Sequence, residues 1–177
     1  LKSMDLSSNK MYSFARDMFL FSFYTRGMAF VDMAFLRKKD LNKGTLSYRR
    51  KKTGQLLFIK WEPCMQEIVD RYFDAESPYL LPLIKKAGVK ERNQYINGMH
   101  QINKYLGKIG EDMNIPIPLT LYVARHTWAS VAKSKNIPLS VICEGMGHDS
   151  ETTTRIYLTS LDTTPVDRAN HLILNSL

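Results

Sequence analysis

Two motifs in the last third of the chain carry side chains that are suited to chemistry on a phosphate. The first is Arg125-His126-Thr127, and the second is Gly147-His148, followed nine residues after its histidine by Tyr157. An arginine binds phosphate oxygens through parallel hydrogen bonds and keeps its charge throughout. A tyrosine hydroxyl can act as a covalent nucleophile. Together these residue types could act on a phosphate group.

Each motif taken singly also has an ordinary structural explanation. Arg125 could form an ion pair on a helix surface. Gly147-His148 could end a helix, with the glycine as its cap and the histidine near the negative end of the helix dipole. Tyr157 lies between Ile156 and Leu158 and could be a core aromatic. Chemistry is therefore indicated by the motifs occurring together and in this order.

The positive charge of the chain is concentrated in one segment. The full sequence has a formal net charge of +8, and residues 37–60 alone contain nine basic side chains and one acidic side chain. Such a concentration predicts a surface that binds a polyanion, and nucleic acid is the first candidate. The residues expected to contact it are Lys38, Lys39, Arg49, Arg50 and Lys51.

Length and composition exclude several classes of protein. A chain of 177 residues, 44% of them hydrophobic, is long enough for one domain with a buried core and too apolar to be disordered. No apolar run approaches the roughly 20 residues that span a bilayer. Cys64 and Cys143 form neither a metal-binding pair nor a disulfide framework, and the four histidines lack metal-site spacing. We expect a cytoplasmic protein without a metal or cofactor.

The spacing of apolar and turn residues predicts a mostly helical domain. Ser7-Ser8-Asn9 caps a helix that runs to about Tyr24, and a short helix follows at residues 29–35. Residues 45–51 and 55–60 are predicted to be antiparallel strands around a turn at Lys52-Thr53-Gly54. Further helices are predicted at residues 63–73, 91–113, 120–135, 138–145 and 166–177. The expected fold class is mainly α with a small antiparallel β-sheet.

The order of these motifs resembles that of the tyrosine recombinase (phage integrase) family. There, an arginine on an early helix and a lysine on a β-hairpin precede a His-x-x-Arg motif, a Gly-His motif and a nucleophilic tyrosine. Lys52-Thr53-Gly54, Arg125-His126-Thr127-Trp128-Ala129 and Gly147-His148 with Tyr157 match the last four features. The resemblance, which extends to integrases of conjugative transposons, implies that residues 1–177 form a single catalytic domain with the DNA breaking-rejoining fold. The family's N-terminal core-binding helical domain is expected to be absent from this chain.

The resemblance also implies a role for each site residue. Arg26 and Arg125 would hold the scissile phosphate while Tyr157 attacks it and forms a 3′-phosphotyrosine. Lys52 would protonate the departing 5′-oxygen, and His148 would hydrogen-bond the phosphate or the nucleophile. The predicted catalytic set is Arg26, Lys52, Tyr122, Arg125, His148 and Tyr157. The implied protein is a metal-independent, site-specific recombinase of double-stranded DNA that forms a homotetramer through its C-terminal helix.

Two positions depart from the family pattern. Tyr122 stands where the histidine of His-x-x-Arg is usual, and a phenol, with an ordinary pKa of about 10, is a poor general base at neutral pH. Ala29 stands where the family has its first arginine. Arg26 precedes Ala29 by three residues and would share a helix face with it, which makes Arg26 the candidate replacement.

These departures leave other functions open. One alternative is a catalytically inactive integrase remnant that only binds DNA. Another is strand cleavage like that of a type IB topoisomerase, which shares the chemistry but needs no paired sites. A helix–turn–helix module within residues 120–150 would leave Tyr157 unexplained. A histidine phosphatase is disfavoured because its Arg-His-Gly motif follows an N-terminal strand, whereas Arg125-His126-Thr127 lies late in the chain within a predicted helix.

Overall fold

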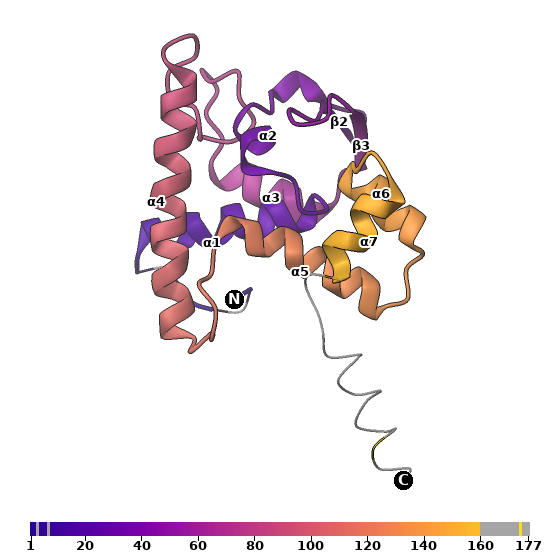
Figure 1. Cartoon of the computed structure of the whole chain (residues 1–177). Coiled ribbons are helices and arrows are strands. Elements are labelled where there is room, and N and C mark those ends of the chain that lie inside the picture. Colours follow the sequence, from indigo (N-terminus) through magenta and orange to yellow (C-terminus); the bar gives the residue numbers. More distant parts are fainter. Residues whose placement is uncertain (3, 7, 160–173, 175–177) are drawn as a thin grey trace.

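Helices make up most of the described part of the chain, which comprises residues 1–2, 4–6, 8–159 and 174 of a computed structural model. The helices are α1 (Lys10–Tyr24), α2 (Phe30–Ala34), α3 (Pro63–Arg71), α4 (Glu91–Asp112), α5 (Leu121–Ser134), α6 (Leu139–Met146) and α7 (Glu151–Thr159). A short 3₁₀ helix, η1 (Lys38–Asp40), leads into three strands, β1 (Leu41–Asn42), β2 (Thr45–Arg49) and β3 (Leu56–Lys60). The predicted fold class is confirmed (Figure 1).

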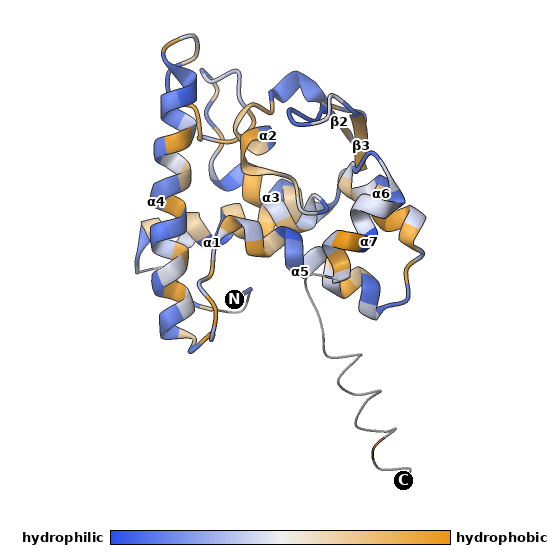
Figure 2. Cartoon of the chain, in the orientation of Figure 1, coloured by the Kyte–Doolittle hydropathy of each residue, from blue (hydrophilic) through white to orange (hydrophobic). Residues whose placement is uncertain are grey.

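The main hydrophobic core surrounds α1. This helix begins where predicted, because the Asn9 side chain accepts hydrogen bonds from the backbone N–H groups of Met11 and Tyr12. It packs against α3, α4 and α5, and its Met18 and Phe21 are fully buried. Figure 2 shows hydrophobic and hydrophilic residues alternating along α4, as expected of a helix that covers a core with one face.

The sheet is antiparallel, in the order β1-β2-β3. Lys43 and Gly44 both have positive φ between β1 and β2, which suits a two-residue hairpin turn. Tyr48 on β2 pairs with Leu57 on β3, and both side chains face the core. The strands are shorter than predicted because Arg50 donates its backbone N–H to the Gln55 carbonyl and starts the turn there. β1 was not predicted, since two residues carry no periodicity.

A second, smaller cluster of buried apolar side chains lies beneath α5, α6 and α7. It consists of Ala129, Ala132, Ile142, Met146 and Leu158. Trp128, Leu139 and Tyr157 pack against it from its edge. This cluster fixes α7 against α5 and so sets the position of the proposed nucleophile.

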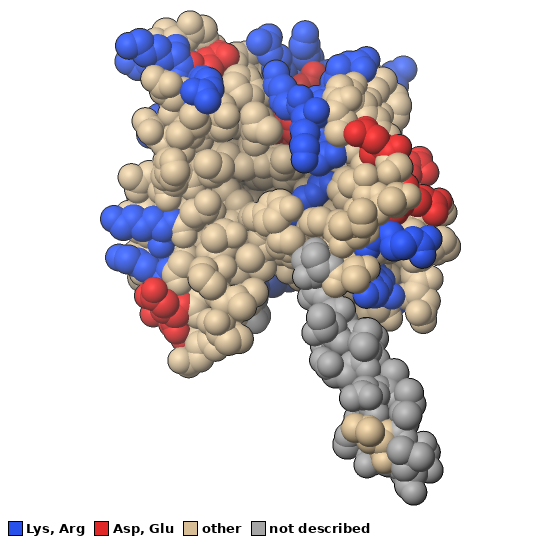
Figure 3. All heavy atoms as spheres, viewed as in Figure 1, with Lys and Arg blue, Asp and Glu red and all other residues tan. Residues whose placement is uncertain are grey.

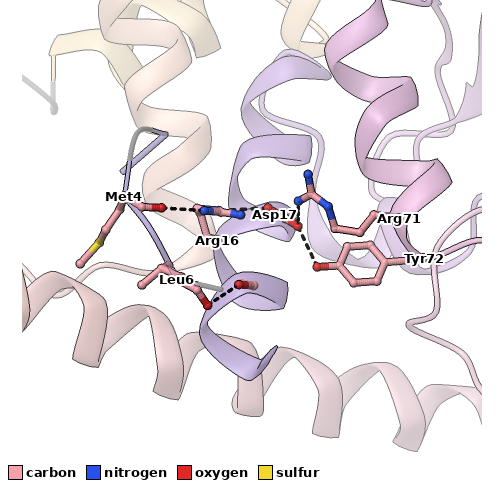
Figure 4. Close-up of polar contacts among 7 residues, drawn as sticks. Met4, Leu6, Arg16, Asp17, Arg71 and Tyr72 are labelled. Carbon is pink, nitrogen blue, oxygen red and sulfur yellow. Dashed lines mark hydrogen bonds and ion pairs between the residues drawn. The ribbon is translucent and has the colours of Figure 1, made fainter. Parts of the chain in front are cut away.

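The buried carboxylate of Asp17 ties α1 to α3. It accepts hydrogen bonds from the Arg71 guanidinium, from the Tyr72 hydroxyl at 2.7 Å and from Arg16 at 3.1 Å (Figure 4). Burial and the bond to Asp17 raise the pKa of Tyr72. A buried charge of this kind needs its partners, so the network holds the two helices in one arrangement.

The C-terminal part of the prediction lies outside the described residues. The helix expected at residues 166–177 falls there, apart from Leu174, which is helical and exposed. Within the described residues, no helix combines the length and apolar character needed to cross a membrane.

Candidate active site

Segments far apart in the sequence meet around a cavity of about 740 Å³. Its walls come from the loop before α2, the turn between β2 and β3, α4, α5, the turn after α6, and α7. Five of the six predicted catalytic residues line it, namely Lys52, Tyr122, Arg125, His148 and Tyr157. Arg26 is not among the lining residues.

Arg125 is held rigidly on α5. Its side chain is buried, and it donates hydrogen bonds of 2.8 Å to the carbonyl oxygens of Gly27 and Met146. Burial lowers the pKa of the guanidinium, and the nearby Arg50 lowers it further, although an arginine remains protonated at any physiological pH. The approach of Gly27 is very close, because a Cβ on this glycine would lie 2.8 Å from Arg125 Cα.

His148 is neutral and has a defined tautomer. Its Nε2 lies 2.9 Å from Nη2 of Arg125, and arginine can only donate, so Nε2 is the acceptor. The imidazole proton is therefore on Nδ1, which lies 2.8 Å from the Thr154 hydroxyl. Burial and the charge of Arg125 lower the pKa of His148 to about 4. Gly147, in the left-handed region at φ 63°, ends α6 and turns the chain so that His148 meets Arg125.

Tyr157 on α7 lies between the two histidines. Its hydroxyl is 2.9 Å from Nδ1 of His126, and the two rings are parallel within 8° with centroids 5.2 Å apart. The His148 ring lies edge-on to the Tyr157 ring at 5.6 Å. Burial and the neighbouring Tyr122 raise the pKa of Tyr157, so its hydroxyl is protonated in the free protein.

Arg50 lines the cavity as well, although the sequence had suggested an exposed contact to DNA. It is only 7% exposed and donates a hydrogen bond to the Gly147 carbonyl. The contact is tight, since a Cβ on Gly147 would lie 3.2 Å from Arg50 Cδ and 2.8 Å from Leu57 Cδ1. The site therefore holds two buried guanidinium groups. The burial of Arg50 could have been predicted from the alternation along β2, because Leu46 and Tyr48 face inward and Arg50 is the next residue on that face.

Lys52 lies at the exposed mouth of the cavity, on a turn that is anchored at its base. The buried carboxylate of Asp32 accepts the backbone N–H of Lys51 at 2.8 Å. Burial raises the pKa of Asp32, and this hydrogen bond together with Arg50 opposes the rise. Thr53 also lines the cavity, and its hydroxyl has no hydrogen-bond partner among the described residues. The turn thus presents the exposed Lys52 side chain to the cavity, while the Thr53 hydroxyl is buried.

The helix-face explanation for Arg26 is wrong. Arg26 lies in the loop between α1 and α2 with φ 63°, and Ala29 is the residue before α2, so the two share no helix face. The Arg26 side chain lies against α6, where a Cβ on Gly145 would be 3.6 Å from Arg26 Cδ. Its catalytic role stays a prediction.

The other residues predicted to contact DNA differ in their exposure and in their contacts within the protein. Lys39, Arg49 and Lys51 are exposed, although Arg49 donates to the Gly54 carbonyl and Lys51 lies over the Phe35 ring. Lys38 is half-buried and donates to the carbonyl oxygens of Asp74 and Ala75. Figure 3 shows basic side chains gathered near the sheet and extending toward a hollow in the visible face.

Comparisons of the three-dimensional structure give clear matches, whereas the sequence matches neither a family model nor a curated protein. XerH site-specific recombinase bound to a palindromic difH substrate matches 88% of this chain and 45% of its own, with TM-score 0.62 and 18% identity. A lambda integrase dimer bound to a COC′ core site matches 84% of this chain and 45% of its own, with TM-score 0.59 and 14% identity. The Tn1549 transposon integrase in complex with transposon right end DNA matches 97% of this chain and 64% of its own, with TM-score 0.58 and 14% identity.

These matches define the fold. The described helices and the small antiparallel sheet have the arrangement of the tyrosine recombinase catalytic domain. The three matching proteins described above, which share this fold, are site-specific recombinases and integrases. The chain spans about half the length of the lambda integrase and XerH chains that it matches. Among the residues that the structure describes, no group of three or more His, Cys, Asp or Glu side chains could hold a metal ion.

Proposed function

We propose that this chain is the catalytic domain of a site-specific recombinase that cleaves and rejoins DNA strands through a 3′-phosphotyrosine. The observation that carries the proposal is the meeting of Lys52, Arg125, His148 and Tyr157 around one cavity, from four separate segments of a recombinase-like fold. An inactive, merely DNA-binding remnant would have no need of a buried guanidinium pair beside a tyrosine. In this proposal Arg50 supplies the second guanidinium group, which the related family has at the position of Ala29.

The proposed reaction begins with the scissile phosphate between Arg50 and Arg125. The two guanidinium groups offset the negative charge that builds up on the non-bridging oxygens, at about 3 kcal/mol for each well-placed donor. The Tyr157 oxygen forms a bond to phosphorus as the bond to the 5′-oxygen breaks. Lys52 gives its proton to that oxygen, which leaves as a hydroxyl. Rejoining is the reverse, with a 5′-hydroxyl attacking the phosphotyrosine.

His148 contributes through its neutral form. Because its proton is on Nδ1, its Nε2 lone pair orients Arg125 and keeps the guanidinium turned toward the cavity. The proposed mechanism draws its positive charge from arginine and lysine and uses no metal or cofactor.

The proposed substrate is double-stranded DNA, and the proposed assembly is a homotetramer. The exposed cations Lys39, Arg49 and Lys51 lie on or near the hairpin that carries Lys52, so backbone binding would deliver the phosphate to the cavity. The matching structures include a transposon integrase in complex with transposon end DNA and a lambda integrase tetramer bound to a Holliday junction. The C-terminal helix proposed to join the protomers lies outside the described residues.

Covalent trapping tests this function. We would use a pool of short duplexes of randomised sequence, each with one 5′-bridging phosphorothiolate, because the thiol released on cleavage does not rejoin efficiently. We expect a protein–DNA adduct that survives denaturation and is absent in Tyr157→Phe. Tyr105→Phe, a matched change on α4, should retain it. Absence of the adduct from the parent chain under conditions where it binds the pool would refute the recombinase function and leave the DNA-binding remnant.

A second assay separates the two enzymatic possibilities. A type IB topoisomerase relaxes supercoiled DNA without pairing sites, whereas a recombinase exchanges strands between two copies of its site. Once sequencing of the trapped adducts has identified a site, plasmids with one and with two copies can be compared. We expect recombination products only from the plasmid with two copies.

A further inference from the structure

The chemistry proposed above leaves one proton unassigned. Tyr157 must lose its hydroxyl proton as it attacks, yet its pKa is raised and the phenol of Tyr122 stands where the related family has an imidazole. We propose that His126, the residue that follows the catalytic arginine on α5, accepts this proton. This inference rests on the proposed function.

The geometry places an acceptor directly at the nucleophile. His126 Nδ1 is 2.9 Å from the Tyr157 hydroxyl oxygen, within the range for direct proton transfer. The parallel stacking of the two rings and the edge-on contact of Tyr122 with His126, at 4.3 Å between centroids, fix the orientation of the imidazole. In the proposed arrangement the imidazole proton is on Nε2, so that the Nδ1 lone pair accepts the hydrogen bond from Tyr157.

Several other polar groups around the cavity are already engaged. His148 accepts from Arg125 at Nε2 and carries its proton on Nδ1, so it has no free lone pair for Tyr157. Arg125, Arg50 and Lys52 are cations and can only donate. Asp32 accepts from the Lys51 backbone and holds the base of the hairpin.

The electrostatics of His126 suit a base that works only when DNA is bound. The groups that act on it are Arg125 and Tyr122 on its own helix and Tyr157 on α7. Burial, and then the charge of Arg125, lower its pKa, so the free protein holds a neutral imidazole that is ready to accept. A bound phosphate adds negative charge beside Arg125 and thereby favours the imidazolium that the reaction creates.

The step balances as follows. The Tyr157 oxygen bonds to phosphorus, and its proton moves to His126 Nδ1, which becomes an imidazolium. The bond from phosphorus to the 5′-oxygen breaks, and Lys52 supplies the proton for that oxygen. His126 gains one proton and Lys52 loses one, so rejoining returns both to their starting states without an outside reagent.

The test measures single-turnover formation of the covalent adduct on the phosphorothiolate pool, where the leaving thiolate needs no acid. His126→Asn keeps a hydrogen-bond acceptor near the position of Nδ1 but cannot take the proton. We expect it to react at least about 100-fold more slowly than the parent. The same assay on His100→Asn, a matched histidine on α4, should give the parent rate. DNA binding by His126→Asn should also match the parent.

Two readouts distinguish proton acceptance from a structural role. The parent rate should fall with an inflection in the histidine range as the pH is lowered from about 8 to about 5, and His126→Asn should lack this inflection. Added imidazole should restore part of the rate to His126→Ala. A parent-like rate in His126→Asn would overturn the inference, as would a slow variant with an unchanged pH profile and no rescue. If the parent forms no adduct, the proposed function itself fails.

Discussion

Arg125 and His148 are joined by a hydrogen bond of 2.9 Å in which only the arginine can be the donor. Only the neutral form of the His148 imidazole is compatible with this contact, because a protonated ring would place two cations against each other. Thr154, which is completely buried, completes the arrangement by facing Nδ1 at 2.8 Å. The neutral form of His148 is thus favoured by contacts that exist in the protein without a ligand.

The first prediction follows from this depressed pKa. Between the unfolded value of about 6.5 and the folded value of about 4, the unfolded chain binds a proton at His148 that the folded chain does not. The contribution of neutral His148 to the free energy of unfolding should therefore be fully present above about pH 6.5 and should be lost as the pH is lowered toward 4. We expect the Tm of the parent to decrease more steeply over this range than that of His148→Gln. Parallel curves for the two proteins would contradict the assigned charge state.

The second prediction concerns the identity of the second phosphate-binding arginine. Because Arg50 lines the cavity and Arg26 does not, Arg50→Ala should slow adduct formation by about 100- to 1,000-fold, the cost of losing one oxyanion donor. Arg26→Ala should have a smaller effect. Arg50→Lys, which keeps the charge but not the forked geometry, should fall between parent and alanine. A larger loss in Arg26→Ala than in Arg50→Ala would return the role to Arg26.

The third prediction assigns the general acid. Lys52→Ala should slow cleavage of ordinary DNA by about 100-fold or more, because the 5′-oxygen is a poor leaving group without a proton. On the 5′-bridging phosphorothiolate the same variant should react close to the parent rate. Lys39→Ala is the control for loss of a cation from the same surface. A variant that the thiolate does not rescue would move the proton donor to another residue, with Lys51 the first to examine.

The fourth prediction concerns the glycine beneath Arg125. A side chain at Gly27 must adopt φ 72° and would meet the Arg125 backbone at 2.8 Å, so Gly27→Ala should destabilise the domain by about 2–4 kcal/mol. This corresponds to a decrease in Tm of roughly 5–15 °C. Gly107→Ala on α4 should be neutral or stabilising, because an added Cβ would meet no described atom within 4 Å outside the neighbouring turns of the helix backbone. Equal Tm values for the two variants would show that the close approach is not required.

The fifth prediction concerns the DNA surface. Each freely exposed cation that contacts a phosphate should contribute about 0.9 to the slope of log K against log salt concentration. We therefore expect Lys39→Gln and Lys51→Gln each to reduce that slope by about this amount. Lys38→Gln should change it less, because Lys38 already donates to two backbone carbonyls. Titration of fluorescent duplex at several salt concentrations measures the slopes, and a salt-independent affinity would contradict a role for these lysines.

Much of the fold could be predicted from periodicity and capping residues. Asn9 and Gly147 were visible as helix boundaries, and the apolar spacing in α4 and the glycine in the β2–β3 turn located those elements. The helix boundaries and the strand turn are local features, so a single sequence contains them. The grouping of Arg125, His148 and Tyr157 was predicted from the resemblance of the motif order to the tyrosine recombinase family, and the structure places them around one cavity.

The remaining features depend on contacts between distant segments. Burial of Arg50 arises from its contact with Gly147, which lies in another part of the chain. The position of the Arg26 side chain is set by the loop between α1 and α2, where Arg26 and Gly27 both have positive φ, and not by a helix face shared with Ala29. His126 is four residues after Tyr122 and so shares its face of α5, but only the docking of α7 brings Tyr157 to it.

The small apolar cluster beneath α5, α6 and α7 has a consequence for when the nucleophile is in place. Among the residues that the structure describes, the cluster contains five buried residues and is separate from the main core around α1. Segments with so little buried apolar surface open at a lower free-energy cost than the domain as a whole. Amide hydrogens of α6 and α7 should thus exchange with solvent faster than those of α1, in a local opening that withdraws Tyr157 while Arg125 on α5 stays in place.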